Sequence, residues 1–550
     1  MTLQNAHAAF QNGDYKKADE VLASLRDISS PDSAIFHLSA LTALRRQQPQ
    51  QALEYIQLAL QTPVHKDEVL NSLGRIFQAL GEDVQAETAF RQALDVSPNF
   101  TLARTNLINQ LIDLGDPEKA SVELEWLLSG ETDNIDYSAA LSAAMLDMNE
   151  TDEALKTLSK FKADEAKACV YRARALFQQG DFSGAIAQSS RAYKYPNYAG
   201  QALKLSLQIA AMTGTWGSVS GQVIEEVLSR HPNLDNLWAV AISASYKSGD
   251  VHSAQRLFEN SPKGPSTLSA QVDYLNGRGN FKSAETLIKK ALTLHPGFPA
   301  GLAQYCLTLL GLGEYNQAQS VADIALRSSP NNQFYYAIKA TAGRKKGQNY
   351  GYYFDYKNFV RAYTLPVPQG WKTLADFNQA LAEELSALHN FSDAPLDQTL
   401  RSGTQTSPNL KFVNSPAIKS FFETVEKPIA EYLSAIGRNK NHPFLRRNSG
   451  QFRIRSGWSV LLGAGGHHVN HVHPEGWISS SYYVDVPKPN GREGNIVFGQ
   501  PPIDMGLKEE HEIKPEPGRL VLFPSYLWHG TIPISGTESR LTLPIDIMPA

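Results

Sequence analysis

The segment GEDVQAETAFRQALDVSPNF (residues 81–100) decides the fold of the first half of this chain. Its Gly is followed five residues later by Ala86, then by the large apolar Phe90, by a second alanine and by Pro98. The segment GNFKSAETLIKKALTLHPGF (residues 279–298) carries the same arrangement at the same offsets. Self-similarity at fixed offsets is the sequence signature of a repeat architecture.

The small residue five positions after the turn glycine gives the period of the repeat. It recurs every 34 residues at first and less regularly later, at Ala18, Ala52, Ala86, Ala120 and Ala154, then Ala185, Ala254, Ala284 and Ala318. The 69-residue interval between Ala185 and Ala254 leaves room for one degenerate unit at TWGSVSGQVIEEVLSRHPNL (residues 215–234). The sequence therefore predicts about ten units.

The residue types explain the spacing. Ala at position i, a larger apolar residue at i+4 and Ala at i+7 lie on one helical face, and the small residues let two helices approach closely. Gly before this helix permits a tight turn, and Pro after it ends the helix. The pattern resembles the tetratricopeptide repeat over residues 1–345. That resemblance implies an all-α right-handed superhelix whose concave face binds a protein or peptide partner.

Length and composition restrict the possible partners. A chain of 550 residues exceeds what one core organises, so we expect several domains. The net charge of −4 lacks the basic excess typical of nucleic-acid or membrane-surface binding, and no stretch is apolar enough for a membrane span. Two distant cysteines, Cys169 and Cys306, exclude a disulfide framework. We expect a cytoplasmic protein that binds neither nucleic acid nor membrane.

The repeat pattern stops after residue 345. Residues 346–450 contain a Tyr, Phe and Pro cluster and two helical stretches, at 373–391 and 415–436, which predict a helical support region. Residues 451–550 contain short β-like runs punctuated by Gly, Pro and Asn, namely QFRIRSGWSVLL, WISSSYYVDVP, GNIVFG, GRLVLFPS and RLTLPIDIM. This part of the sequence predicts a small β-barrel or jelly roll.

Histidines gather at the start of this β region. Four of the fourteen lie in GGHHVNHVHPEG (residues 465–476). Residues two apart share a face of an extended segment, so His471 and His473 project together and could hold one metal ion. Pro474 favours extended geometry at the residue before it. We expect the third ligand to be His529, at the end of the apolar strand in GRLVLFPSYLWHG, and we interpret the remaining two, His467 and His468, as solvent-facing loop residues.

The last strand offers a seat for an anion. In SRLTLPIDIM, Arg540 and Thr542 share one face, so a guanidinium and a hydroxyl point the same way into the barrel. Such a pair suits a carboxylate. Asp485 and Asp546 are expected to face solvent or to end their strands, and neither is proposed as a ligand.

These motifs together resemble a known enzyme family. The order H-x-H, SYYV, G-R-L-V-L-F-P-S-x-x-x-H and R-x-T, with FDYKNFV, FNQALAEEL and LRSGTQT before it, resembles the Fe(II)- and 2-oxoglutarate-dependent oxygenases, specifically a group that bacteria often fuse to tetratricopeptide repeats. The resemblance covers most of residues 346–550 and implies a double-stranded β-helix (jelly roll) with supporting helices. It implies that His471 and His529 bind Fe(II), that Arg540 with Thr542 binds the distal carboxylate of 2-oxoglutarate, and that Tyr483 adds a hydroxyl.

The sequence departs from the family pattern in two places. The slot for a carboxylate ligand, two residues after the first histidine, holds His473. The iron site therefore consists of His471, His473 and His529, or the triad slides by two residues and uses His473, Glu475 and His529. The spacing to SYYV favours the first set, and the usual facial triad of two histidines and one carboxylate favours the second. Ser480 stands where related sequences often have Gly, which narrows the pocket.

The resemblance implies an oxidoreductase that uses Fe(II), 2-oxoglutarate and dioxygen. The repeat array next to the barrel favours hydroxylation of a protein or peptide substrate, with a small metabolite as the other possibility. The alternative function is a non-catalytic repeat scaffold that carries a degenerate oxygenase barrel, and His473 in the carboxylate slot favours it. A third hypothesis, a cupin-like metalloenzyme that works without 2-oxoglutarate, is disfavoured by Arg540 and Thr542.

Overall fold

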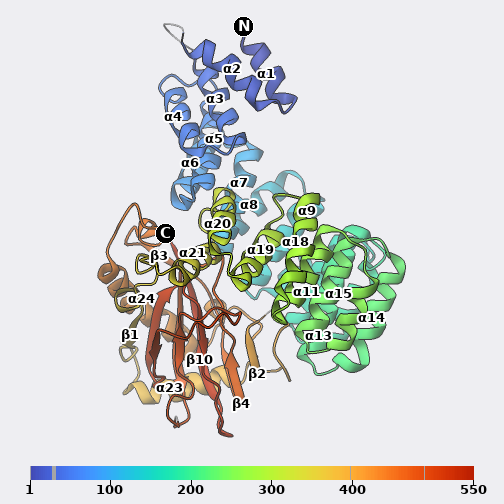
Figure 1. Cartoon of the computed structure of the whole chain (residues 1–550), viewed down its shortest axis with the longest axis vertical. Helices are drawn as coiled ribbons and strands as arrows, with labels where there is room; N and C mark the ends of the chain where they lie inside the picture. The colour runs from blue at the N-terminus through green and yellow to red at the C-terminus, as the bar shows by residue number, and fades with distance from the viewer. Residues whose placement is uncertain (1, 28–31, 397, 489) are drawn as a thin grey trace. The chain divides into compact units, whose positions relative to one another are not determined.

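The structure, a computed structural model, describes residues 2–27, 32–396, 398–488 and 490–550. The chain divides into two compact units. The first comprises residues 1–131, 326–331 and 549–550, and the second comprises residues 132–325 and 332–548. Figure 1 shows helices in the blue to green part of the chain and strands in its orange to red part.

Paired helices make up the first 345 residues. They are α1 (Leu3–Gln11), α2 (Tyr15–Arg26), α3 (Ser33–Arg45), α4 (Pro49–Ala59), α5 (Lys66–Leu80), α6 (Asp83–Val96), α7 (Thr101–Asp113), α8 (Pro117–Gly130), α9 (Ile135–Asp147), α10 (Thr151–Leu158), α11 (Ala166–Gln178), α12 (Phe182–Ala192), α13 (Pro196–Met212), α14 (Trp216–Arg230), α15 (Asp235–Lys247), α16 (Val251–Asn260), α17 (Pro265–Gly277), α18 (Phe281–Leu294), α19 (Pro299–Leu312), α20 (Tyr315–Ser328) and α21 (Gln333–Lys345).

The turn-and-alanine pattern has the structural role that the sequence predicts. All nine alanines of the series are completely buried, as close approach of two helices requires. The turn residue five positions before each alanine has a positive φ, which glycine adopts at little cost. Two units use other residues there, Gln47 (φ 60°) and Asn149 (φ 63°). The degenerate unit keeps its turn at Gly214 (φ 70°), between α13 and α14. The prediction of a helical repeat array is confirmed.

The C-terminal part combines helices with two antiparallel sheets. Its helices are α22 (Tyr356–Phe359), α23 (Leu374–Ser386) and α24 (Pro416–Ile436), with short 3-10 helices η1 (Leu410–Phe412) and η2 (Leu445–Arg447). Its strands are β1 (Arg361–Thr364), β2 (Leu400–Gln405), β3 (Phe452–Gly457), β4 (Val460–His468), β5 (Ile478–Asp485), β6 (Ile496–Phe498), β7 (His511–Ile513), β8 (Arg519–Pro524), β9 (His529–Thr531), β10 (Arg540–Leu543) and β11 (Ile545–Pro549).

Strand order sets up the site. The large sheet runs β1-β8-β5-β10-β4-β2, with β11 paired to both β3 and β5, and the small sheet runs β7-β6-β9. Helices α23 and α24 pack on the outer side of the large sheet, because the Tyr482 ring contacts Phe421 and its hydroxyl donates a hydrogen bond to Asn378 at 2.6 Å. These two sheets and their supporting helices confirm the predicted antiparallel β domain (Figure 1).

Helix α21 contacts the loop that follows His473 and the loop that precedes His529. The Trp528 indole donates a hydrogen bond to the Thr341 hydroxyl at 2.8 Å, and the backbone N–H of Gln333 donates to the carbonyl of Pro474 at 2.8 Å. Trp528 precedes His529, and Pro474 follows His473. The helix that ends the predicted repeat array is therefore also part of the packing of the β domain.

Among the helices that the structure describes, none has both the length and the apolar character that crossing a membrane requires.

Candidate metal centre

Backbone pairing brings the three predicted histidines together. His471 and His529 form an antiparallel bridge, in which each backbone N–H donates to the carbonyl of the other at 2.9 and 3.0 Å. The N–H of His473 donates to the carbonyl of Ser525 at 3.0 Å. One point of the sequence analysis was wrong: His529 does not end the apolar strand β8, which stops at Pro524, but begins β9 after a turn.

The three imidazoles point at a common position. One ring nitrogen from each lies within 4.8 Å of the others. Ring centroids are 4.2 Å apart for His471 and His529, and 5.3 Å apart for His473 and either neighbour. This spacing suits three nitrogen ligands of one transition-metal ion, each about 2 Å from it.

Each imidazole is held through its Nδ1 atom, and Nε2 of His471 also lies 3.5 Å from the Thr399 hydroxyl. Nδ1 of His471 lies 2.8 Å from the carbonyl of Val469, and Nδ1 of His529 lies 2.9 Å from the carbonyl of Leu527. Nδ1 of His473 lies 2.9 Å from Oδ1 of Asp546. Since an oxygen acceptor requires a proton on Nδ1, the neutral form of each ring presents Nε2 as a metal ligand.

Electrostatics favour neutral rings at two of the three positions. Burial, with the neighbouring His473 second, lowers the pKa of His471 to about 3. Burial, with His471 second, holds the pKa of His529 well below its usual range. At His473 burial also opposes protonation, but the Asp546 carboxylate raises the pKa above its ordinary value. Neutral imidazole is the form that binds metals.

Glu475, the alternative ligand, points away from this position. Its side chain is 81% exposed, and its Oε2 lies 3.5 Å from the guanidinium of Arg455. Within the described residues, the side chains that converge closely enough to bind one metal ion are those of His471, His473 and His529.

Two residues that the sequence analysis assigned to solvent lie at the cavity instead. His468, at the end of β4, lines it, and its Nδ1 lies 3.1 Å from the Thr399 hydroxyl. Asp546 also lines it and holds His473. Asp546 is placed there by the pairing of β11 with β5, which sets it opposite Ser479. In RLTLPIDIM, Asp546 lies on the same face as Arg540 and Thr542 if the extended backbone continues through Pro544. The sequence alone does not show that it does.

The predicted anion seat is buried and retains free hydrogen-bonding capacity. Arg540 is 2% exposed, donates one hydrogen bond to the carbonyl of Gly494 at 2.8 Å, and forms no ion pair with any described residue. Its Nε and the buried hydroxyl of Tyr483 form no hydrogen bond of 3.5 Å or less in the described part of the chain, and the Ser481 side chain is the polar group that interacts with this hydroxyl. The guanidinium carbon lies 5.8 Å from the centre of the Tyr483 ring. Thr542 shares this face of β10, as predicted.

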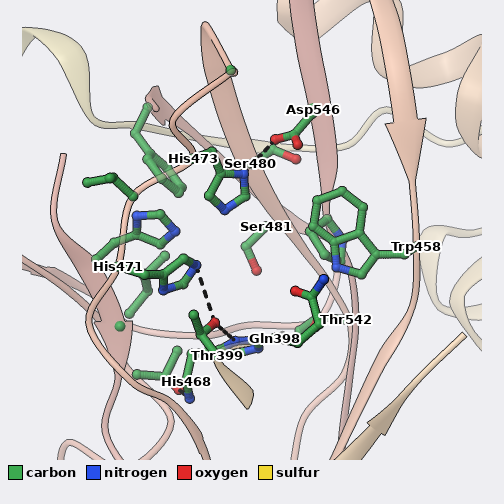
Figure 2. A pocket seen from close by; sticks show the side chains of 18 of the residues that line it. Gln398, Thr399, Trp458, His468, His471, His473, Ser480, Ser481, Thr542 and Asp546 are labelled. Atoms are coloured by element: carbon green, nitrogen blue, oxygen red, sulfur yellow. Dashed lines mark hydrogen bonds and ion pairs between the residues drawn. The ribbon is translucent and has the colours of Figure 1, made fainter. Parts of the chain in front are cut away.

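One cavity of about 500 Å³ is lined by the three imidazoles and by Arg540 and Thr542, whereas Tyr483 is not among its lining residues. Figure 2 shows His471 and His473 on one side of the hollow and Ser481 and Thr542 across from them, with the bond from His473 to Asp546 directed away from His471. The wall comprises Gln398, Thr399, Gln405, Arg455, Ser456, Trp458, His468, His471, Val472, His473, Pro474, Glu475, Gly476, Ser480, Ser481, Ile496, Phe523, His529, Gly530, Thr531, Arg540, Thr542, Pro544 and Asp546.

Comparisons with known proteins identify two regions. Residues 456–546 match the family model described as "Putative 2OG-Fe(II) oxygenase", and residues 67–194 match a tetratricopeptide repeat model. The search of curated proteins found no match.

Several solved structures are similar to parts of the chain at low identity. Yeast Tom70 is 10% identical, with 81% of this chain and 97% of that chain covered and a TM-score of 0.33. A Pseudomonas putida prolyl-4-hydroxylase is 18% identical, covering 36% and 96% with a TM-score of 0.25. The C-terminal part of a TPR repeat-containing protein from Cytophaga hutchinsonii is 16% identical, covering 44% and 99% with a TM-score of 0.36.

The three converging imidazoles lie within the region of the oxygenase match, and the matched repeats lie within the helical array. The chain thus carries tetratricopeptide repeats in its N-terminal part and, in its C-terminal part, a domain that matches the family described as "Putative 2OG-Fe(II) oxygenase".

Proposed function

We propose that this chain is an Fe(II)- and 2-oxoglutarate-dependent dioxygenase that hydroxylates a protein or peptide substrate recruited by its repeats. One observation carries the proposal: three imidazoles that converge on a common position share a cavity with a buried guanidinium that no described side chain neutralises. The first feature suits a metal ion, and the second suits a carboxylate.

The donor set fits iron. Imidazole nitrogen is a ligand that Fe(II) accepts, and three ligands on one side leave positions for a chelating cosubstrate and dioxygen. We propose His471, His473 and His529 as the ligands. Glu475 is disfavoured because its exposed carboxylate is engaged by Arg455.

The anion seat fits the distal carboxylate of 2-oxoglutarate. A buried guanidinium without a counter-ion is costly, and a carboxylate from a ligand removes that cost. We propose that Arg540 binds this carboxylate, with Nε and the Tyr483 hydroxyl as donors that form no hydrogen bond of 3.5 Å or less in the described residues. Thr542 lies beside them on β10.

The residues of the cavity position the reactants and exclude water. Bound Fe(II) with 2-oxoglutarate supplies the activation of dioxygen that oxidation of an unactivated C–H bond requires. His471, His473 and His529 orient the metal, and Arg540 fixes the cosubstrate relative to it. Apolar wall residues such as Val472, Ile496 and Phe523 reduce access of water to this position.

Contacts between repeats and barrel support a macromolecular substrate. Phe391 stacks on Phe177 of α11 with ring centroids 5.6 Å apart, and Leu396 packs against the core of α11 to α17. Gln398 and Thr399, immediately beyond, line the cavity. A polypeptide bound to this part of the repeats would lie close to the entrance of the cavity.

Release of succinate tests the oxidative function. Purified protein supplied with Fe(II), 2-oxoglutarate and dioxygen is expected to form succinate, and His529→Ala and Arg540→Ala are expected to lose it. Loss of two charge-assisted hydrogen bonds at Arg540 weakens 2-oxoglutarate binding by about 100-fold or more. His467→Ala removes a neighbouring imidazole that does not line the cavity and serves as the control. Equal succinate release by wild type and His529→Ala would contradict the proposal.

A second comparison tests the ligand set. His473→Ala is expected to abolish tight metal binding, measured by titration of the metal-free protein, whereas Glu475→Ala is expected to bind metal as the wild type does. Loss of metal binding in both variants would favour the shifted triad of His473, Glu475 and His529. Loss in Glu475→Ala alone would exclude the three-histidine set.

The non-catalytic scaffold is the alternative function. It predicts that the wild-type protein binds a partner through its repeats and forms no succinate even with that partner present. The retained guanidinium without an anion favours the enzyme, because a barrel without a cosubstrate gains nothing from a buried, unpaired charge.

A further inference from the structure

The three histidines differ in what holds them. Nδ1 of His471 and Nδ1 of His529 each face a backbone carbonyl, which is neutral. Nδ1 of His473 faces the carboxylate of Asp546 at 2.9 Å. His473 is also the residue that occupies the carboxylate slot of the usual facial triad.

Several strands fix Asp546 in this place. Pairing of β11 with β5 sets Asp546 opposite Ser479, whose hydroxyl donates to the same Oδ1 atom at 3.3 Å. The Ser479 hydroxyl lies 2.8 Å from that of Ser525, and the Ser525 carbonyl accepts the backbone N–H of His473. The carboxylate and the imidazole that it holds therefore belong to one closed hydrogen-bond network.

The cavity offers few other sources of negative charge. Among the described residues that line it, the acidic side chains are Glu475 and Asp546. Glu475 is exposed and paired with Arg455. Asp546 is thus the carboxylate placed to act on the three-histidine set.

A carboxylate behind a ligating histidine changes the ligand. It fixes the ring orientation and tautomer, and it raises the basicity of the nitrogen that faces the metal. Three neutral ligands leave the full positive charge of a divalent ion uncompensated, whereas a carboxylate one hydrogen bond away offsets part of it.

We propose that Asp546 is a positioning residue that supplies, through His473, the negative charge that a direct carboxylate ligand supplies in a two-histidine, one-carboxylate site. This inference rests on the proposed function, because it takes His471, His473 and His529 as the metal ligands. In this arrangement the carboxylate of the facial triad acts on the metal through the imidazole of His473 and does not bind the metal directly.

Binding of Co(II) to the full-length protein tests the inference without turnover. Asp546→Asn keeps the shape of the side chain and removes the charge, and it is expected to weaken Co(II) binding by about 10- to 100-fold and to shift the visible absorption bands of the bound ion. Asp485→Asn removes an exposed carboxylate from the end of β5 and is the matched control, with affinity and spectrum like those of the wild type.

A rescue variant separates the charge from a purely structural role. His473→Asp combined with Asp546→Asn moves a carboxylate to the metal, and it is expected to bind Co(II) more tightly than Asp546→Asn alone. If Asp546 only supports the fold, the double variant binds no better than the single one, and the inference is overturned. Unchanged Co(II) affinity and spectrum in Asp546→Asn also overturn it.

Ser479→Ala keeps the test decisive if Asp546→Asn does not fold. This variant removes one donor to Asp546 and is expected to weaken Co(II) binding to a smaller extent, whereas wild-type affinity would overturn the inference. The outcomes stay separate from those of the proposed function. A wild type that forms succinate while Asp546→Asn binds Co(II) normally overturns the inference alone. If the wild type forms no succinate but Asp546→Asn still weakens Co(II) binding, the proposed oxygenase activity alone is overturned.

Discussion

Arg540 holds a buried guanidinium that no described residue neutralises. Burial also opposes its charge and lowers its pKa from the ordinary value. A fold selected for stability alone would replace such a group with an apolar one. Residues that cost stability and remain buried are characteristic of binding sites, where the ligand supplies the missing partner.

Tyr483→Phe removes one hydroxyl and tests whether this residue helps to bind the carboxylate of 2-oxoglutarate. The hydroxyl forms no hydrogen bond of 3.5 Å or less in the described residues, so its removal is expected to leave the free energy of unfolding unchanged or slightly higher. Loss of one hydrogen bond to a charged ligand costs about 1.5 kcal/mol, which weakens 2-oxoglutarate binding by about tenfold. Urea unfolding and 2-oxoglutarate titration under anaerobic conditions measure the two effects. A large loss of stability with unchanged 2-oxoglutarate affinity would contradict the proposed seat.

The repeat turns are the elements that the sequence describes best. A residue with positive φ lies at the turn between the paired helices, and in the nine regular units the alanine five positions later is completely buried. At Gln47 the unit accepts a non-glycine residue in this conformation, although left-handed backbone costs such residues about 1–2 kcal/mol.

Gln47→Gly is therefore expected to stabilise the protein. Relief of the left-handed strain outweighs the greater backbone entropy that glycine brings to the unfolded chain, for a net gain of about 0.5–1 kcal/mol. Gln47 is exposed, so few side-chain contacts are lost. Urea unfolding measures the change. Gly81→Ala, at the equivalent turn with φ 70°, is the opposite control and is expected to destabilise.

At the scale of the whole molecule, repeat and barrel segments share one compact unit. Helix α21 contacts the loops that follow His473 and precede His529, through Gln333 and Thr341. Asn149, in a repeat turn, exchanges two hydrogen bonds with Asn409, at 2.8 and 3.0 Å. The geometry of the three converging histidines thus depends on residues far outside the matched oxygenase region.

Thr341→Val tests this dependence. The substitution keeps the side-chain shape but leaves the buried Trp528 indole N–H without its acceptor, which costs about 1–3 kcal/mol. We expect a lower melting temperature and weaker metal binding, because Trp528 adjoins His529. Thr341→Ser keeps the hydroxyl and should retain wild-type metal affinity. Wild-type stability of Thr341→Val would show that this hydrogen bond does not support the loop.

The sequence by itself determined the repeat array, the change to β structure and the three histidines that converge. Periodicity of small residues, the H-x-H pair and the R-x-T alternation are local patterns, and local backbone geometry is enough to interpret them. The helices α23 and α24 and the longer strands were also predicted. The strands β1, β2, β7 and β9 were missed, because these short segments contain no run of apolar residues.

Only the tertiary structure decided how these residues act together. Asp546 is 73 residues from His473, and the two meet because β11 pairs with β5 while the segment after β4 turns back over β9. The same packing leaves Glu475 exposed and places His468 at the cavity, although Glu475 was expected as an alternative ligand and His468 was expected to face solvent. Which charged groups share a low-dielectric cavity depends on strand pairing over long separations, and local sequence does not encode it.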